Sequence, residues 1–163
     1  GMEKADQKIS VMLMFTGDKA GKAEQAINYY TSVFGTGSGI FGIARYSKDD
    51  NDTEGTVKHA EFRLGNRSFM AIDSSLMHQF GFNEAVSLVV ECETQEEIDY
   101  FWEKLTEGGE EVQCGWLKDK FGVSWQIVPA ILGKLMNDPS RAERVTNAFL
   151  KMKKFDIEKL LQA

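Results

Sequence analysis

The chain has 163 residues, 42% of them hydrophobic and 27% charged, and its 11 Phe, 4 Tyr and 3 Trp exclude an intrinsically disordered protein. A formal net charge of −6 without any basic tract argues against nucleic acid as a partner. The longest apolar runs, such as residues 11–15, are far shorter than the roughly 20 apolar residues that a membrane-spanning helix needs. The two cysteines, Cys92 and Cys114, are too few for a disulfide framework. We therefore expect a cytoplasmic protein of one domain or two small modules, without a nucleic acid or membrane partner.

The first part of the chain predicts a strand, a helix and three strands. The predicted elements are a strand over 9–15, a helix over 20–34 and strands over 38–46, 56–64 and 67–73. The helix follows from apolar residues spaced alternately by three and four, and Gly35 is expected to end it. Gly65–Asn66 is expected to form a two-residue hairpin turn between the last two strands.

The strand over 56–64 alternates in polarity, so its two faces are expected to differ. One face is expected to carry Ala60, Phe62 and Leu64, and the other Val57, His59, Glu61 and Arg63.

The same order of elements repeats after a loop over 74–84. A strand is predicted over 85–92, and Thr94 with Glu97 predicts a capping box at the start of the next helix. Three short strands are predicted within 110–128, with a tight turn over 118–122. The sequence therefore predicts an internal duplication of architecture.

The remaining residues have a helical period. Pro129 is expected to be the first residue of a short helix that runs to Met136. A second helix is expected after Asp138–Pro139, with an apolar stripe of Ala142, Val145, Phe149 and Met152. Asp156 is expected to cap a last turn, with Phe155 and Leu160 as its hydrophobic staple.

Two segments resemble binding loops. Residues 35–39 are rich in glycine, like a nucleotide or S-adenosylmethionine loop, but such loops follow a strand and precede a helix. Here the predicted order is reversed, which favours a helix stop. Residues 50–55 with Glu61 nearly match a calcium-binding EF-hand loop, but predicted strands flank them, so a solvated hairpin loop is favoured.

His59 and Glu61 are two residues apart on one predicted strand, so both side chains share a face. They could serve as a base, a hydrogen-bond clamp or a partial metal site, or form a solvated pair without catalytic function. No HxH or HExxH spacing occurs, so a histidine-rich metal site is not predicted.

The most chemically dense segment is 113–129. Trp116, Trp125 and Gln126 could line a small-molecule pocket, although tryptophans in a short hairpin are also ordinary core residues. Cys114 has no evident base in the sequence, which favours an inert thiol over a nucleophile.

Four segments together resemble one family. Residues 55–64, 67–73, 82–92 and 113–129 are similar to the PhnB-like proteins of the vicinal oxygen chelate superfamily, which includes glyoxalase I, extradiol dioxygenases and bleomycin-resistance proteins. The resemblance extends over roughly residues 8–160.

The resemblance implies an α+β fold of two βαβββ modules whose curled mixed sheets surround a ligand cleft. The modules are expected at 8–73 and 85–128 within one unit of 8–128. A helical extension, 129–163, is expected to pack on the sheet or at the interface of a homodimer.

Metal-dependent relatives hold their ligands on the first and last strand of each module. These positions correspond here to Ser10, residues 71–73, Ser87 and Gln126. Asp73 could bind a metal and Gln126 could do so weakly, but serines are poor ligands for divalent ions. We therefore expect no metal and no cofactor.

The resulting hypothesis is a PhnB-like protein that binds a small apolar or aromatic metabolite and possesses a proton-transfer, lyase or isomerase activity. The expected catalytic residues are His59 and Glu61. The expected substrate-binding residues are Asp73, Ser87, Cys114, Trp116, Trp125 and Gln126. The alternatives are a non-catalytic sequestering protein of the bleomycin-resistance type and a metal-dependent enzyme that uses Asp73 with His59 and Glu61. Chains of this kind often bear the name 3-demethylubiquinone-9 3-methyltransferase, but the position of the glycine-rich segment disfavours methyl transfer.

Overall fold

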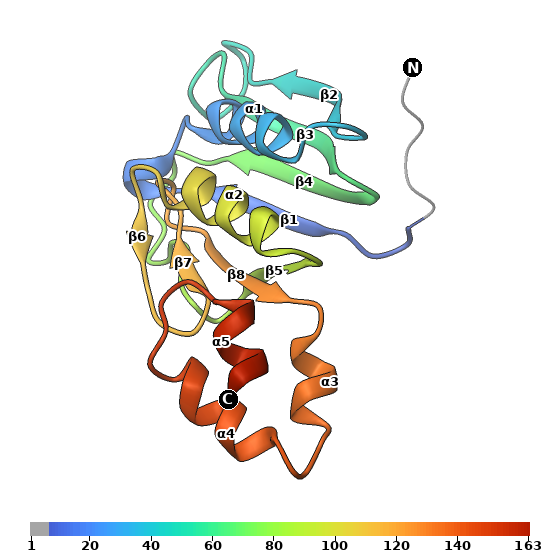
Figure 1. The fold of residues 1–163 in the computed structure, drawn as a ribbon. Helices are drawn as coiled ribbons and strands as arrows, with labels where there is room; N and C mark the ends of the chain where they lie inside the picture. Colours follow the sequence, from blue (N-terminus) through green and yellow to red (C-terminus); the bar gives the residue numbers. More distant parts are fainter. Residues whose placement is uncertain (1–6) are drawn as a thin grey trace. The chain divides into compact units, whose positions relative to one another are not determined.

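The computed structural model describes residues 7–163, which form two compact units. The first unit ends at Gly81 and the second comprises Phe82–Ala163, so the division lies in the loop predicted over 74–84. Each unit contains a four-stranded mixed sheet and a helix that packs on it (Figure 1). The predicted α+β fold with a duplicated order of elements is confirmed.

The first unit has the predicted four strands and one helix, together with a short 3₁₀ helix that was not predicted. Its elements are β1 (Val11–Phe15), the 3₁₀ helix η1 (Gly17–Lys19), α1 (Ala23–Phe34), β2 (Gly39–Arg45), β3 (Val57–Leu64) and β4 (Arg67–Asp73). The strand order is β1-β4-β3-β2, with β1 parallel to β4 and the other pairs antiparallel. Leu64 pairs with Arg67, so Gly65–Asn66 is the predicted two-residue turn.

The core of the first unit lies between α1 and one face of its sheet. Ala60 pairs with Ala71, which pairs with Leu13, and all three are buried. From α1, Ile27 and Tyr30 are also buried. Burial of each large apolar side chain contributes about 1.5–3 kcal/mol to folding. This face therefore fixes which side chains of β3 lie on the opposite face.

One residue of β3 departs from the predicted alternation. Val57 was expected beside His59, but it is buried, with 1% of its surface exposed. Ala44 and Arg45 are consecutive on β2 but pair with His59 and Val57, which leaves Lys58 as an extra residue in β3. This bulge reverses the side of the sheet that Val57 faces.

The second unit repeats the order and adds three helices. Its elements are β5 (Ser87–Cys92), α2 (Gln95–Thr106), β6 (Glu110–Glu111), β7 (Trp116–Lys118), β8 (Ser124–Pro129), α3 (Leu132–Met136), α4 (Ala142–Phe149) and α5 (Ile157–Gln162). The strand order is β5-β8-β7-β6, with β5 parallel to β8. At the start of α2, the Thr94 side chain accepts a hydrogen bond from the Glu97 N–H at 3.2 Å, as predicted. The Glu97 carboxylate accepts from the Glu93 N–H rather than from that of Thr94.

The C-terminal helices pack inside the second unit. Val145 of α4 is fully buried, and the Phe149 and Phe155 rings lie 5.8 Å apart, so the predicted stripe is used within the chain. Asp156 accepts a hydrogen bond from the Lys159 N–H at 3.1 Å and caps α5 as predicted.

The predicted helix start at Pro129 is wrong. Pro129 ends β8, where it pairs with Cys92, and α3 begins only at Leu132. Proline lacks an N–H and suits the end of a strand as well as the first turn of a helix. Pairing with β5 determines that Pro129 ends a strand here, because the N–H of the next residue, Ala130, donates to the Cys92 carbonyl at 2.8 Å.

Candidate functional site

His59 and Glu61 line a shallow depression of about 360 Å³ in the first unit. Its other lining residues all come from the edge strand β2: Phe41, Gly42, Ile43 and Ala44. The pairing of β2 with β3 shifts between Ile40 and Gly42, directly opposite Glu61. Such bulges bend an edge strand and redirect its side chains, and they are frequent beside binding sites. The two predicted catalytic residues therefore lie together, next to an apolar wall.

The row of residues through Glu61 crosses the whole sheet on the face opposite α1. Glu61 pairs with Gly42 on one side and with Met70 on the other, and Met70 pairs with Met12. Directly paired residues share a face, so the carboxylate has methionine side chains as its neighbours. Met12 is 42% exposed, so part of this apolar row is open to solvent. This face therefore combines two proton-carrying groups with an apolar surface that could contact a carbon skeleton.

Asp73 has a structural role. It is 1% exposed, and its Oδ1 accepts hydrogen bonds from the N–H groups of Gly21 and Ala23, at 2.8 and 3.1 Å. Its Oδ2 accepts from the Val57 N–H at 2.9 Å. The carboxylate therefore joins the start of α1 to β3, and it points away from the face that carries His59. Asp73, predicted to contact a substrate, thus has both carboxylate oxygens bound to backbone N–H groups of its own unit.

In the second unit, three predicted residues share the face opposite α2. Gln126 pairs with Trp116 on β7 and with Val89 on β5, so these side chains form one row. The Gln126 side-chain amide donates to the Ser87 hydroxyl at 3.0 Å. Ser87, Trp116 and Gln126 are each half-buried. The structure thus brings these three predicted binding residues together.

Ser124 is a further polar residue on this face that the sequence analysis did not select. It pairs with Ser87 and with Lys118, and only 1% of its surface is exposed. Within residues 7–163 its hydroxyl has no hydrogen-bond partner. A buried polar group without a partner is costly, so such groups frequently mark a ligand or water position. Counting back two residues from Gln126 along the strand would have identified it.

An ion pair lies at the edge of the same face. The Lys118 ammonium pairs with the Glu84 carboxylate. This contact raises the pKa of the Lys118 ammonium and lowers the pKa of the Glu84 carboxyl. Both groups are therefore charged at neutral pH, and neither is poised to transfer a proton.

Trp125, for which both a pocket wall and an ordinary core position were considered, lies in the core. Its side chain is 2% exposed and lies on the opposite face from Gln126, because adjacent residues of a strand alternate. Its indole N–H donates to Asp119 Oδ2 at 2.8 Å. Asp119 also accepts from the N–H groups of Phe121 and Val123, and so holds the tight turn predicted over 118–122.

Cys114 connects the sheet to the C-terminal segment through its backbone. Its N–H donates to the Met152 carbonyl, and the N–H of Gly115 donates to the Lys153 carbonyl, both at 2.8 Å. Cys114 has a φ of 57°, in the left-handed region that non-glycine residues rarely adopt. A side chain on Gly115 would lie 2.5 Å from the Phe155 ring. The Cys-Gly pair therefore docks the tail through its backbone, and contact of the half-buried Cys114 side chain with a substrate stays a prediction.

The other thiol, Cys92, is fully buried. Burial raises its pKa to about 12, with smaller contributions from the carboxylates of Glu97 and Glu93. A thiol this far from ionisation is a poor nucleophile at neutral pH.

The two segments that resemble binding loops have internal partners. Asp50 accepts from the Ser47 N–H and pairs with Lys58, and Asp52 accepts from the N–H and hydroxyl of Ser75. The Gly35 N–H donates to the Thr31 carbonyl at 2.9 Å, so the glycine-rich residues 35–39 lie at the C-terminal end of α1. That end of a helix carries the negative dipole and disfavours an anionic cofactor.

The residues at the superfamily's metal positions do not fit a divalent ion. Asp73 accepts three backbone N–H groups, and Ser87 and Gln126 are hydrogen-bonded to each other. Nowhere in residues 7–163 do three His, Cys, Asp or Glu side chains gather as they would around a metal. No helix in this described part is long and apolar enough to cross a bilayer.

Comparison with known proteins identifies the family. A family model described as 3-demethylubiquinone-9 3-methyltransferase matches residues 7–128. A PhnB protein from Bacillus cereus that bears the same name is 46% identical, over 76% of this chain and 100% of that chain, with a TM-score of 0.69. The chain belongs to this PhnB-like family. The predicted family is therefore confirmed.

More distant structures share the fold of this PhnB-like chain. A Pseudomonas aeruginosa protein is 16% identical, over 75% of this chain and 98% of that chain, with a TM-score of 0.60. A gene product of Arabidopsis thaliana is 21% identical, over 75% and 98% of the two chains, with a TM-score of 0.50. No curated protein matches the chain.

Proposed function

We propose that this PhnB-like chain binds a small, neutral, apolar or aromatic metabolite on the face of its first sheet opposite α1. His59 and Glu61 then exchange a proton with a carbon next to a carbonyl group. The main support is that both residues line one depression whose remaining wall is an apolar segment of β2. An apolar wall binds the carbon skeleton, and an adjacent carboxylate or imidazole can remove and return a proton.

The second unit carries a polar face of its own, which we propose as a separate binding surface. Gln126 and Ser87 can orient an oxygen of a small molecule bound there, and Trp116 provides an aromatic surface beside them. The buried hydroxyl of Ser124, which lacks a partner within residues 7–163, supports a ligand group or an ordered water at this position. No residue of this set is a general acid or base, so its role is binding.

Sequestration without catalysis is the second candidate. The face of the second sheet opposite α2 supports sequestration. Its polar and aromatic side chains can bind a ligand but are not general acids or bases: Ser87, Trp116, Ser124 and Gln126. The two candidates differ only in whether a bound ligand exchanges hydrogen with solvent.

Acetophenone in D₂O separates these candidates, because it is a neutral aromatic ketone with exchangeable methyl hydrogens. Proton NMR follows the loss of the methyl signal as a base removes a proton and a deuteron replaces it. We expect exchange above the solvent rate with the wild type and a loss of that excess in Glu61→Gln and His59→Gln. The control is Lys58→Gln, on the same strand but exposed. Binding at residues 41–44 and 59–61 without faster exchange would support sequestration instead.

A homodimer remains a proposal that rests on the family resemblance. The apolar stripe of α4, which first suggested an interface, packs within the second unit, while Leu150 and Leu161 stay exposed at 58% and 44%. Sedimentation velocity tests the proposal, and a single species of monomer mass would contradict it.

A further inference from the structure

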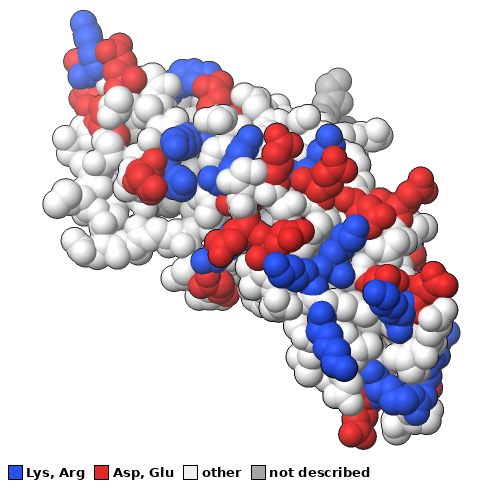
Figure 2. Space-filling model, turned by 60° about the vertical axis from the view of Figure 1, so that its left-hand side comes forward, with Lys and Arg blue, Asp and Glu red and all other residues white. Residues whose placement is uncertain are grey.

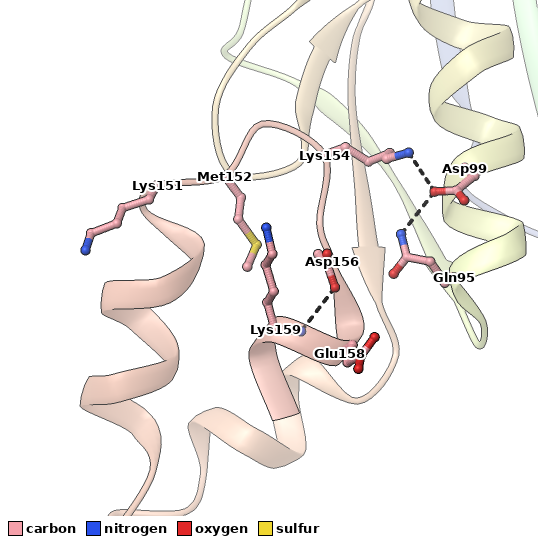
Figure 3. Close-up of a pocket in the computed structure, with 8 residues that line it drawn as sticks. All are labelled: Gln95, Asp99, Lys151, Met152, Lys154, Asp156, Glu158 and Lys159. Atoms are coloured by element: carbon pink, nitrogen blue, oxygen red, sulfur yellow. Dashed lines mark hydrogen bonds and ion pairs between the residues drawn. The ribbon is translucent and has the colours of Figure 1, made fainter. Parts of the chain in front are cut away.

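A second pocket, of about 510 Å³, lies in the second unit between α2 and the segment that joins α4 to α5 (Figure 3). Its lining residues are Gln95, Asp99, Lys151, Met152, Lys154, Asp156, Glu158 and Lys159. None of these side chains takes part in the function proposed above, so the pocket is considered independently.

The walls of this pocket are held in place by hydrogen bonds to backbone groups. The Gln95 side-chain amide donates to the Phe155 carbonyl at 2.9 Å, and its oxygen accepts from the Ile157 N–H at 2.8 Å. The contact between the Cys114 N–H and the Met152 carbonyl fixes the opposite end of the segment. A preformed pocket binds a ligand without an ordering cost for its walls.

Every carboxylate of the pocket already has a donor. Asp99 accepts from the Lys154 ammonium at 2.7 Å and from Gln95 at 3.0 Å, and these contacts lower its pKa. Asp156 accepts from the backbone N–H of Lys159, and Glu158 accepts from Gln162 at 3.1 Å.

Two of the pocket's ammonium groups, by contrast, have no carboxylate. Within residues 7–163 neither Lys151 nor Lys159 forms an ion pair. Figure 3 shows the Lys159 side chain extending beside Met152, whereas Lys151 lies at the rim with its ammonium group directed away from the other labelled residues. Residues 129–163 carry seven Lys and Arg against four Asp and Glu, although the whole chain has a net charge of −6. Basic side chains accordingly gather over this end of the molecule in Figure 2. The two ammonium groups without an ion-pair partner therefore provide the positive charge that an anion requires, beside the three carboxylates of the lining.

We propose that this pocket binds a small organic anion. Its carboxylate or phosphate group contacts the ammonium of Lys159, with Lys151 closing over it, and its apolar part packs on the Met152 thioether and the lysine stems. The ligand class thus differs from the neutral metabolite proposed for the sheet face.

Titration of the ¹⁵N-labelled chain with benzoate and, separately, with inorganic phosphate tests this site. We expect saturable shifts at the amides of residues 95–99 and 151–159, and tighter binding of benzoate if Met152 contributes. Lys159→Gln removes one charge-assisted contact and is expected to weaken binding about tenfold or more. Lys153→Gln, which changes the charge equally but lies outside the lining, is expected to weaken it much less.

Three outcomes would overturn the site. They are no saturable shift with either anion, shifts confined to other parts of the chain, and an equal loss of binding in Lys153→Gln and Lys159→Gln. Lys151→Gln provides a second exposed substitution, and it should also weaken binding more than Lys153→Gln does.

Discussion

Replacement of Asp73 by asparagine separates a structural carboxylate from a ligand-binding one. Asparagine has only one acceptor oxygen, so its NH₂ group would face at least one of the three backbone N–H donors that the Asp73 carboxylate now accepts from. An unsatisfied buried donor costs about 1–3 kcal/mol, and the remaining bonds lose their charge assistance. Together these effects predict a loss of about 2–5 kcal/mol in the free energy of unfolding. At roughly 2–4 °C per kcal/mol for a chain of this size, the melting temperature should fall by about 4–20 °C.

Calorimetry and urea denaturation of Asp73→Asn provide the assay. Asp49→Asn is the matched control, because Asp49 is exposed, and it should change stability by no more than about 0.5 kcal/mol. If Asp73→Asn were as stable as the wild type, the three hydrogen bonds would not hold α1 to β3 as described. Asp73 would then return to the list of candidate ligand residues.

Three further predictions concern the second unit. Gly115→Ala places a Cβ 2.5 Å from the Phe155 ring at a φ of +82°. We therefore expect the free energy of unfolding, measured by urea denaturation, to fall by about 1–3 kcal/mol. A change near zero would contradict the described docking of the tail. A thiol reagent should modify half-buried Cys114 in the native protein and Cys92 only after unfolding, and rapid loss of both thiols would refute the inert role of Cys92. The contact with Lys154 lowers the pKa of Asp99 in the folded protein. The contribution of Asp99 to the free energy of unfolding is therefore complete above its unfolded pKa near 3.9, and it is lost as pH falls through the folded pKa. Asp99→Asn should therefore flatten the decline in melting temperature below about pH 4, and an unchanged decline would contradict the ion pair.

Elements with strong local signals could be predicted from the sequence. The strand over 67–73 and the two-residue turn before it match the structure at every boundary, because alternation and turn residues act locally. Asp156 caps α5 as predicted for the same reason. The strand period also placed His59 and Glu61 on one face, since that inference needs no tertiary contact.

Other features could not be predicted because they depend on contacts between segments that are distant in the sequence. Pro129 suited both a helix start and a strand end, and pairing with Cys92 decided between them. No local sequence pattern distinguishes the burial of Trp116 from that of Trp125, but the register of β7 against β8 places the two side chains on opposite faces of the sheet. The pocket at Lys159 likewise depends on how the tail docks against α2, which no local pattern reports.

The most direct test of the central claim is a titration of the ¹⁵N-labelled chain with acetophenone, read at each backbone amide. The proposed function predicts saturable shifts concentrated at residues 41–44 and 59–61, with weaker binding in a Phe41→Ala variant and unchanged binding in Lys58→Gln. The claim would be contradicted if those amides did not shift at saturating ligand, or if the shifts appeared only around residues 151–159.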